Sequence, residues 1–378
     1  MSLGGKMRTW AEIDLNAIST NVKQFKKCLN NSTKLMVVVK ADGYGHGALE
    51  VSKCAVKSGA DYLAVAACSE AVNLRENNIK TPILILGAVF NEDIPLLIKY
   101  DITPTVVDYE FAKELSNEAV NKNKMAKIHI KLDTGMSRIG YRCENDTYIE
   151  ECIKISKLPN IVIEGIFSHF SKADEHDETY THLQYNTFCK MCEILENNGI
   201  NIPIKHICNS AGIIKYPQYH LDMVRLGISL YGHYPSTEFN ENDIELTPAM
   251  TFKTKIVYIK DVPKDTYVGY GGAYKTDESK KIATLAVGYA DGYPRTLSNK
   301  AYVTVKGKRC KVIGNVCMDQ MMIDVTGLDN LKIGDEVILF GKSGNNNVTV
   351  EEIAALIGTI NYEILCNLSK RVLRIYIQ

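Results

Sequence analysis

Lys40 stands at the end of a five-residue apolar run, Leu35 to Val39, and is followed by a loop with glycines at 43, 45 and 47. The run does not alternate with polar residues, which is typical of a strand buried on both faces of a parallel sheet. Catalytic groups of α/β folds lie at the carboxyl ends of such strands. Lys40 is therefore a candidate catalytic residue, although a lysine that only ends a strand at the surface is by itself the more common explanation of such a position.

The glycine loop also has to be compared with a dinucleotide-binding fingerprint. Gly43-x-Gly45-x-x-Ala48 fits a relaxed form of that motif between a strand and a helix. The motif further needs an acidic residue near the end of the second strand, where it holds the ribose. Asp61 instead precedes the next strand, Tyr62 to Ala66, and so lies at its wrong end. The pattern therefore argues against nicotinamide binding.

Short apolar runs recur along the first 235 residues and alternate with helical patterns such as 48–56, 70–77, 110–121 and 182–197. Eight such alternations favour a (β/α)8 TIM-like barrel, with a doubly wound open sheet as the alternative. The eight predicted strands are 35–39, 62–66, 83–86, 104–107, 128–132, 162–167, 204–208 and 223–225.

Polar residues stand at or just after the carboxyl ends of five of these predicted strands. Each has a structural explanation of its own: an Asn-Ser-Ala-Gly stretch caps helices, Asp133-Thr134-Gly135 suits a turn, and Arg225 suits an ion pair. Their coincidence at the same strand ends favours one shared site. The residues concerned are Lys40 and Tyr44, Lys131 and Arg138, His169, Asn209 and Ser210, and Arg225 with Gly227 and Ile228.

After Pro235 the pattern changes to short alternating strands, which predicts a mainly-β domain over residues 236–378. Its clearest strands are 250–259, 282–287, 301–305 and 336–340, and its clearest helix is 350–357. Residues 1–235 then form the barrel domain, with 1–6 interpreted as an expression remnant and 7–15 as a strand that could pair with the β domain. Gly341-Lys342-Ser343 is not a phosphate loop, because Glu336 stands where that motif needs its first glycine.

Composition excludes several classes of partner. The chain has 44 basic and 44 acidic residues, which leaves no charge excess for nucleic acid or an anionic membrane. No apolar run reaches the length of a membrane span. The 11 scattered cysteines indicate reduced thiols in a cytoplasmic protein. Cys189-x-x-Cys192 has no second pair to complete a metal site and is interpreted as helix packing, so no metal is expected.

Several longer segments, in order along the chain, resemble the alanine racemase family. They cover both predicted domains and depart from the family pattern only slightly, at Asp42, Gly43 and Ser137. The segments are LMVVVKADGYGHG at 35–47, KLDTGMSRIGY at 131–141, FSHF at 167–170, CNSAG at 208–212, VRLGISLYG at 224–232, GYGGAYKT at 269–276, GYADGYPR at 288–295, NVCMDQ at 315–320 and INYEILC at 360–366.

The resemblance implies an isomerase that interconverts L-alanine and D-alanine with pyridoxal 5'-phosphate (PLP), supplying D-alanine for bacterial peptidoglycan. PLP is needed because it delocalises the electrons left when an amino acid loses its α-proton. The family pattern also implies a head-to-tail homodimer with shared active sites. In that pattern Lys40 binds PLP covalently and is one base, while Tyr270 of the partner subunit is the other.

The remaining roles are likewise those that the resemblance implies. A relay runs from Tyr270 through His169 to Arg225, and Arg225 also donates to the pyridine nitrogen of PLP. Arginine stays protonated, so the ring would be a weak electron sink, and transamination would be limited. The phosphate would be held by Tyr44, Ser210, Gly227, Ile228 and Tyr362.

On the substrate side, Arg138 and the backbone of Met318 would orient the carboxylate. Lys131 matches a position that is carbamylated in many members, where the new anion fixes Arg138. Tyr289 and Tyr362 would narrow the entry and favour a small side chain, with Asp319 in a supporting position.

Three alternative functions follow from the same residues. A racemase of serine or of broader specificity needs no change in the pattern. A barrel-type PLP decarboxylase would need an acidic partner for the pyridine nitrogen, where this chain has Arg225. A non-catalytic PLP-binding protein would consist of a single barrel, without the β domain that carries Tyr270.

Overall fold

The computed structural model describes residues 7–143, 147–344 and 346–378, so the predicted remnant at 1–6 lies outside the described residues. The chain divides into two compact units. The barrel unit comprises Ala17–Gly43 and Ala48–Thr247. The β unit comprises the described residues up to Asn16, together with Tyr44–Gly47 and Pro248–Gln378.

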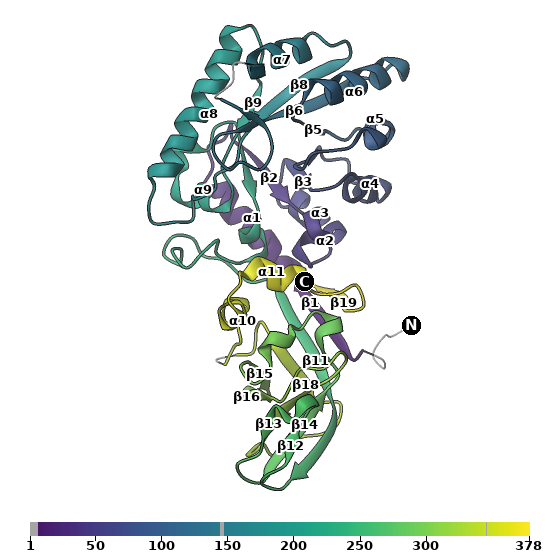
Figure 1. Ribbon diagram of the computed structural model, residues 1–378, viewed down its shortest axis with the longest axis vertical. Helices are drawn as coiled ribbons and strands as arrows, with labels where there is room; N and C mark the ends of the chain where they lie inside the picture. Colours follow the sequence, from purple (N-terminus) through teal and green to yellow (C-terminus); the bar gives the residue numbers. More distant parts are fainter. Residues whose placement is uncertain (1–6, 144–146, 345) are drawn as a thin grey trace. The chain divides into compact units, whose positions relative to one another are not determined.

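Parallel strands form the centre of the barrel unit (Figure 1). Four of them pair in the order β10-β2-β3-β4, and the others pair in the order β5-β6-β8-β9, with the short β7 (Tyr141–Arg142) beside β6. These strands are β2 (Lys34–Val38), β3 (Tyr62–Val65), β4 (Ile83–Ile85), β5 (Thr105–Val106), β6 (Ala126–Asp133), β8 (Ile161–Phe167), β9 (Ile204–His206) and β10 (Met223–Leu226).

Backbone hydrogen bonds join the two sets of strands at both seams. At the first seam, the Ile85 amide donates to Thr103 and the Thr103 amide donates to Ile83. At the second, the Arg225 amide donates to the Cys208 carbonyl. The sheet therefore closes, which confirms the predicted (β/α)8 barrel and excludes the open doubly wound sheet.

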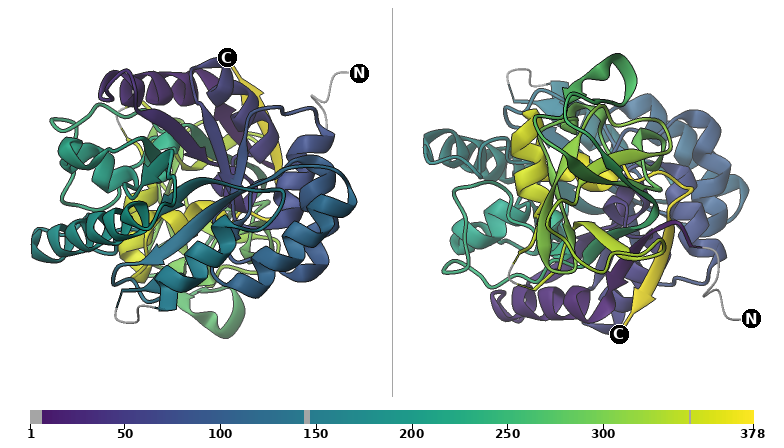
Figure 2. Two further views of the ribbon diagram at one scale, coloured as in Figure 1. Left: turned by 90° about the horizontal axis from the view of Figure 1, so that it is seen from above. Right: turned by 90° about the horizontal axis from the view of Figure 1, so that it is seen from below.

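Helices pack outside these strands, as the blue and teal helices in the left view of Figure 2 show. Predicted helices start and end within a few residues of the observed ones, whereas α5, α7 and α9 were not predicted. The helices are α1 (Leu15–Lys27), α3 (Ala48–Lys57), α4 (Cys68–Glu76), α5 (Ile94–Tyr100), α6 (Tyr109–Asn121), α7 (Thr147–Ser156), α8 (Thr179–Asn197) and α9 (Ser210–Lys215).

The β unit is built on an eight-stranded sheet in the order β14-β17-β16-β15-β18-β11-β1-β19. It also contains a small pair, β12 with β13, and the helices α10 and α11. Their bounds are β1 (Thr9–Asp14), β11 (Met250–Val262), β12 (Tyr267–Val268), β13 (Tyr274–Lys275), β14 (Lys280–Leu285), β15 (Tyr302–Val305), β16 (Lys308–Ile313), β17 (Met321–Asp324), β18 (Glu336–Phe340), α10 (Val350–Ile357), α11 (Asn361–Cys366) and β19 (Leu373–Ile377).

Two segments from the first fifty residues belong to this β unit. The strand β1 pairs antiparallel with β11 and parallel with β19. The loop Tyr44–Gly47 is held by Arg374, whose Nε donates to the Gly45 carbonyl over 2.9 Å. Conversely, residues 236–247 lie in the barrel unit. The division of the chain into 1–235 and 236–378 stays a prediction.

Among the described residues, no helix is both long enough and apolar enough to cross a bilayer. The barrel centre, in contrast, is not wholly apolar. His129, His206 and Arg225 are buried there, together with Lys131. Buried polar groups persist only when they are hydrogen-bonded, so this polar set has to be accounted for.

Candidate active site

Lys40 directly follows the strand β2 and begins a turn of unusual backbone geometry, labelled α2 (Lys40–Tyr44) in Figure 1. Ala41, Asp42 and Gly43 have φ angles of 52°, 52° and 62°, a left-handed conformation that L-residues rarely adopt in succession. The Glu70 carboxylate holds the turn by accepting the Ala41 amide over 2.6 Å. Strained backbone of this kind clusters at functional sites, where the surrounding structure enforces it.

Arg225 on β10 lies at the centre of the barrel's polar groups and is only 2% exposed. Its Nη1 lies 2.7 Å from Nδ1 of His206, and its Nη2 lies 3.0 Å from Nδ1 of His169. Nη2 also lies 2.8 Å from the carbonyl oxygens of Ser168 and Ile207, so its two hydrogens are shared among three acceptors. Because Arg225 pairs in register with Met36 on β2, it stands beside the strand that leads to Lys40.

His169 lies among several cations. Burial first, and then the charges of Arg225, Arg138, Lys131 and Lys40, lower the pKa of His169 well below its usual value. The imidazole is therefore neutral at physiological pH. Since Arg225 can only donate, Nδ1 of His169 accepts, and its single proton resides on Nε2.

Lys131 on β6 is 3% exposed, and its Nζ donates to the Leu132 carbonyl. Burial and the nearby Arg225 lower the pKa of Lys131 to about 7, with Asp133 opposing the change. Lys131 can therefore lose its proton near neutral pH, which leaves a free amine. Arg138 follows on an exposed loop that is shaped by Asp133, whose Oδ1 accepts the amides of Gly135 and Ser137.

Ser210 begins α9, and Gly227 follows β10 at the same end of the barrel. The Ser210 hydroxyl accepts the Gly227 amide over 2.9 Å. Ile228 begins the short helix η3 (Ile228–Tyr231), which directly follows Gly227. Hydroxyl and amide donors brought together in this way can hold an anion without lysine side chains.

The barrel unit thus brings together eight of the predicted site residues, all at the carboxyl ends of its strands or in the loops after them. They are Lys40, Lys131, Arg138, His169, Ser210, Arg225, Gly227 and Ile228.

A second group of predicted residues meets in the β unit. Tyr270, Tyr289, Met318 and Asp319 line one surface hollow of about 700 Å³. Tyr270 is 73% exposed, and its carbonyl accepts the Asn315 side chain over 2.8 Å. An exposed tyrosine beside a hollow is free to contact a further molecule, since little of its ring is covered within this chain.

The walls of this hollow are fixed by an ion-pair network that the sequence did not reveal. The buried carboxylate of Asp291 accepts two bonds from Arg371, at 2.7 and 2.9 Å. Arg371 also reaches Asp319 over 2.8 Å. The amide of Tyr289 donates to the Cys317 carbonyl, which keeps the two wall segments side by side. Bidentate arginine–carboxylate pairs of this kind fix geometry well.

Tyr44 and Tyr362 also lie together in the β unit. Their ring centroids are 6.0 Å apart, and burial, followed by the influence of Tyr362, raises the pKa of Tyr44. Tyr44 therefore stays a hydroxyl and can donate a hydrogen bond at any physiological pH.

Sequence reasoning missed the residues that support Arg225, namely His129 on β6, Glu164 on β8 and His206 on β9. One signal was present. The segment AKIHIKLD at 126–133 alternates polar and apolar residues, although a strand of a fully covered barrel should be apolar throughout. Its polar residues Lys127, His129 and Lys131 lie at alternate positions of β6.

Comparison with known proteins agrees with this geometry. The alanine racemase N-terminal domain family matches residues 13–235, and the alanine racemase C-terminal domain family matches residues 249–376. This chain belongs to the alanine racemase family.

Members of the family from distant organisms are similar over nearly the whole chain. An alanine racemase of Clostridium tetani is 50% identical over 370 residues, which cover 98% of this chain and 95% of that protein. An alanine racemase of Methanococcus maripaludis is 48% identical, covering 97% of this chain and 98% of that protein.

Solved structures of the family share the fold as well. The alanine racemase of Clostridium difficile 630 has a TM-score of 0.94 and 44% identity, covering 98% of this chain and 96% of that one. The Bacillus anthracis alanine racemase with bound L-Ala-P has a TM-score of 0.93 and 36% identity, covering 99% and 96%.

Alanine racemases are PLP-dependent isomerases, and the residues of the barrel unit fit that cofactor. Lys40 supplies an amine that can bond to an aldehyde. The charges of Lys40, Lys131, Arg138 and Arg225 all act on His169, so the strand ends favour an anionic ligand such as a phosphate ester. The Ser210 hydroxyl, whose oxygen accepts the Gly227 amide, can donate its own hydrogen to such a ligand.

Proposed function

We propose that this chain racemises alanine, using PLP held on Lys40. The observation that carries the proposal is the position of Lys40, at the end of β2 and among the cations that surround His169. The family relationship extends over both units, which favours the complete reaction over cofactor binding alone. Arg225 donates to neutral acceptors in the barrel, which disfavours a decarboxylase that needs an acid at this position.

PLP, when bound, delocalises the electron pair left by the departing α-proton. In the proposed site Lys40 holds the cofactor covalently, and Arg225 donates to its ring nitrogen. The phosphate would be held by hydroxyl and amide donors, which are Tyr44, Ser210, Gly227, Ile228 and Tyr362.

Racemisation needs one base on each face of the substrate Cα, and we assign these roles to Lys40 and Tyr270. Lys40 moves the proton on one face and Tyr270 of the partner subunit moves it on the other. His169 supports Tyr270, since its Nε2–H can donate to a tyrosine oxygen while its Nδ1 accepts from Arg225. This arrangement would give the Tyr270 oxygen a hydrogen-bond donor that orients it for proton transfer.

Substrate orientation falls to Arg138 and the backbone of Met318, with Lys131 as a carbamylated support for Arg138. The free amine of Lys131 at neutral pH is the form that reacts with carbon dioxide. Tyr289 narrows the hollow in the β unit, and Asp319 is tied to Arg371 beside it. A small side chain such as that of alanine suits a narrow entry.

The proposal includes a homodimer in which the β unit of one chain completes the site of the other. It also places the enzyme in the cytoplasm and its product in peptidoglycan synthesis. Support comes from the exposure of Tyr270 and from the two family domains present in one chain. Neither a nucleic acid nor a membrane is part of this function.

Incubation with L-alanine followed by chiral chromatography tests the proposal, with L-serine run in parallel. We expect an equal mixture of D- and L-alanine and much slower change of serine. Lys40→Ala should abolish the reaction, while Lys80→Ala, at an exposed position, should leave it intact. Conversion of serine faster than alanine would replace the substrate assignment, and no racemisation of either would refute the function.

A further inference from the structure

A line of buried side chains crosses the barrel interior away from Lys40, and the proposed reaction does not use it. From Arg225 the line continues to His206, with 2.7 Å between Nη1 and Nδ1. From there, Nε2 of His206 lies 2.9 Å from Nδ1 of His129. Finally, Nε2 of His129 lies 3.4 Å from Oε2 of Glu164. Both histidines are 0% exposed, so no solvent replaces these partners.

The chemistry of the two ends fixes the direction of every hydrogen bond between them. Arginine has donors only, so Nδ1 of His206 must accept and the proton of that ring must be on Nε2. Nε2 of His206 then donates to Nδ1 of His129, which leaves the proton of His129 on Nε2. That proton points to the carboxylate of Glu164, which has acceptors only when ionised.

Both rings stay neutral in this arrangement. Burial is the main cause that lowers the pKa of His129 and of His206, and the charge of Arg225 adds to it in both. Glu164 stays ionised: burial works against this, but hydrogen bonds from His129 and Lys127 hold its pKa at about 2. The line therefore joins a cation to an anion through two neutral imidazoles.

Within the described parts of the chain, no carboxylate forms a hydrogen bond directly with Arg225. Its direct partners are the two histidine nitrogens and the carbonyls of Ser168 and Ile207, all of them neutral. A buried cation without an anionic partner is costly. The negative charge of Glu164 lies at the far end of the line. Hydrogen bonds in a chain polarise one another, so the two histidines transmit part of the stabilising effect of this charge to Arg225.

The strands are shaped to make this line. The register of β6 against β8 shifts between Ile128 and His129, whose partners are Ile163 and Gly165. Glu164 is thus the extra residue of a bulge, and bulges re-aim side chains. Gly165 leaves room for the ring, since a Cβ there would lie 2.6 Å from Cε1 of His129.

We propose that Glu164 and His129 are positioning residues that hold His206 as its Nε2–H tautomer, whose Nδ1 fixes the guanidinium of Arg225. The consequence for catalysis rests on the proposed function, in which Arg225 donates to the ring nitrogen of PLP. The tautomers themselves follow from hydrogen bonds within this chain. His206 also stacks on Phe167, with centroids 4.9 Å apart, which restricts rotation of its ring.

The first test determines the tautomers in the holoenzyme labelled with 15N-histidine. Long-range 1H–15N correlation spectra distinguish protonated from unprotonated ring nitrogens, and His129→Asn and His206→Asn spectra assign the signals. We expect both rings to be neutral with the proton on Nε2 at pH 7.5. A proton on Nδ1 of either ring, or a doubly protonated ring, would by itself overturn the proposal.

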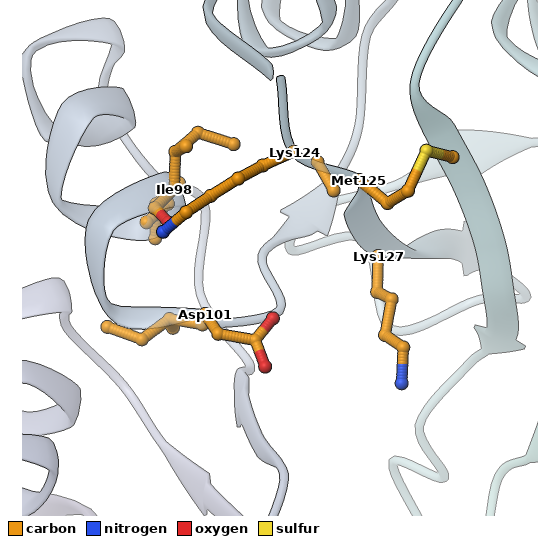
Figure 3. Close-up of a pocket in the computed structure, with 8 residues that line it drawn as sticks. Ile98, Asp101, Lys124, Met125 and Lys127 are labelled. Carbon is orange, nitrogen blue, oxygen red and sulfur yellow. The ribbon is translucent and has the colours of Figure 1, made fainter. Parts of the chain in front are cut away.

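The second test separates positioning from simple stabilisation. Glu164→Gln removes the charge but keeps an acceptor for His129. Lys127→Gln is the matched control, because Lys127 pairs with Glu164 over 2.9 Å but lies outside the line. Lys127 is half-exposed and lines a cavity with Asp101 and Met125 (Figure 3).

We expect Glu164→Gln to shift the Nδ1 signal of His206 and to lower kcat by about tenfold or more with little change in KM. Lys127→Gln should change neither quantity. If Glu164→Gln lowers only thermal stability, with the His206 signals and kcat unchanged, Glu164 is a structural residue and the proposal fails. Equal effects of the two substitutions would also overturn it.

These measurements separate this proposal from the proposed function. The spectra do not depend on turnover, so the expected tautomers in a protein without racemase activity would refute the function and leave the positioning line standing. If the enzyme is active but His206 has a different tautomer, the proposed function stands and the positioning proposal is refuted.

Discussion

At the scale of single residues, a lysine's protonation depends on its neighbours. Lys131 is buried near Arg225 and Arg138, and its burial together with these charges lowers its pKa to about 7. Carbon dioxide adds to the free amine and releases one proton, giving a carbamate anion. That product would turn the repulsion between Lys131 and Arg138 into attraction.

We therefore predict that Lys131 is carbamylated at neutral pH. With 13C-bicarbonate, a carbamate signal should increase with pH through a midpoint near 7, because the amine loses its proton there. An exposed lysine with a pKa of about 10.4 would show no such midpoint. Lys131→Gln should lack the signal. A wild-type spectrum without it, at full activity, would contradict the prediction.

The covalent attachment of the cofactor gives a second prediction at this scale. Borohydride should abolish the visible absorption of the holoenzyme and leave a phosphopyridoxyl group on Lys40. Peptide mapping by mass spectrometry checks the position. Lys131, whose amine is also partly free, is the informative competitor. Label on Lys131 or on any lysine other than Lys40 would show that the assignment of Lys40 is wrong.

A functional residue could be predicted from the sequence when the pattern that marks it lies in the neighbouring residues. Lys40 could be identified because its strand, its glycine loop and its family motif adjoin it. Glu164 could not, because its inward position depends on a bulge between β6 and β8. Arg371 likewise gave no signal, since its partner Asp291 lies 80 residues away in the sequence.

At the scale of elements, the barrel strands β6 and β9 each carry a buried histidine, and a third histidine, His169, lies just after β8. His129, His169 and His206 all have lowered pKa values, mainly through burial. Each is neutral in the folded state and takes up a proton only on unfolding. The contribution of these neutral histidines to the free energy of unfolding is therefore fully present above about pH 6.5, the pKa of histidine in the unfolded chain. It decreases as the pH falls below that value.

We predict a steep loss of stability between pH 6.5 and 5, measured as the urea midpoint at each pH. Each of these histidines contributes a slope of about 1.4 kcal/mol per pH unit at most. His129→Gln should reduce this slope by about 1.4 kcal/mol per pH unit at most, which corresponds to one proton fewer taken up on unfolding. His176→Gln, at an exposed position, should leave the slope unchanged. A slope that is the same in all three proteins would contradict the buried, neutral state of His129.

Most of the barrel strands were predictable because they are apolar runs between turns, whereas β6 alternates polar and apolar residues. All eight predicted runs overlap observed strands, and 336–340 and 350–357 coincide with β18 and α10. Among the helices that were not predicted, α9 and α11 have six residues each and α5 has seven, whereas α7 has ten. Six residues make fewer than two turns, too few for an amphipathic period to stand out.

At the scale of the whole molecule, the proposed dimer makes a quantitative prediction. Lys40→Ala and Tyr270→Phe homodimers should both be nearly inactive, since each lacks one base at every site. Co-expression makes about half of the dimers mixed, and a mixed dimer has one intact site when sites are shared. Roughly a quarter of wild-type activity should then return.

The control for this experiment is mixing of the two variants after each has been purified and shown to stay a homodimer. Activity should remain low there until subunits exchange. Confirmed mixed dimers without recovered activity would show that each site is built within one chain. The prediction then fails, whatever the activity of the wild-type enzyme.

The four residues Tyr44–Gly47 belong to the β unit although barrel residues flank them on both sides. A Cβ on Gly45 would lie 2.2 Å from the Leu365 carbonyl, and one on Gly47 would lie 1.8 Å from the Tyr376 hydroxyl. The residues at positions 45 and 47 must therefore fit residues that lie more than three hundred positions later in the chain. A chimera that takes its carboxyl-terminal part from a distant relative must take the loop at 44–47 from the same parent.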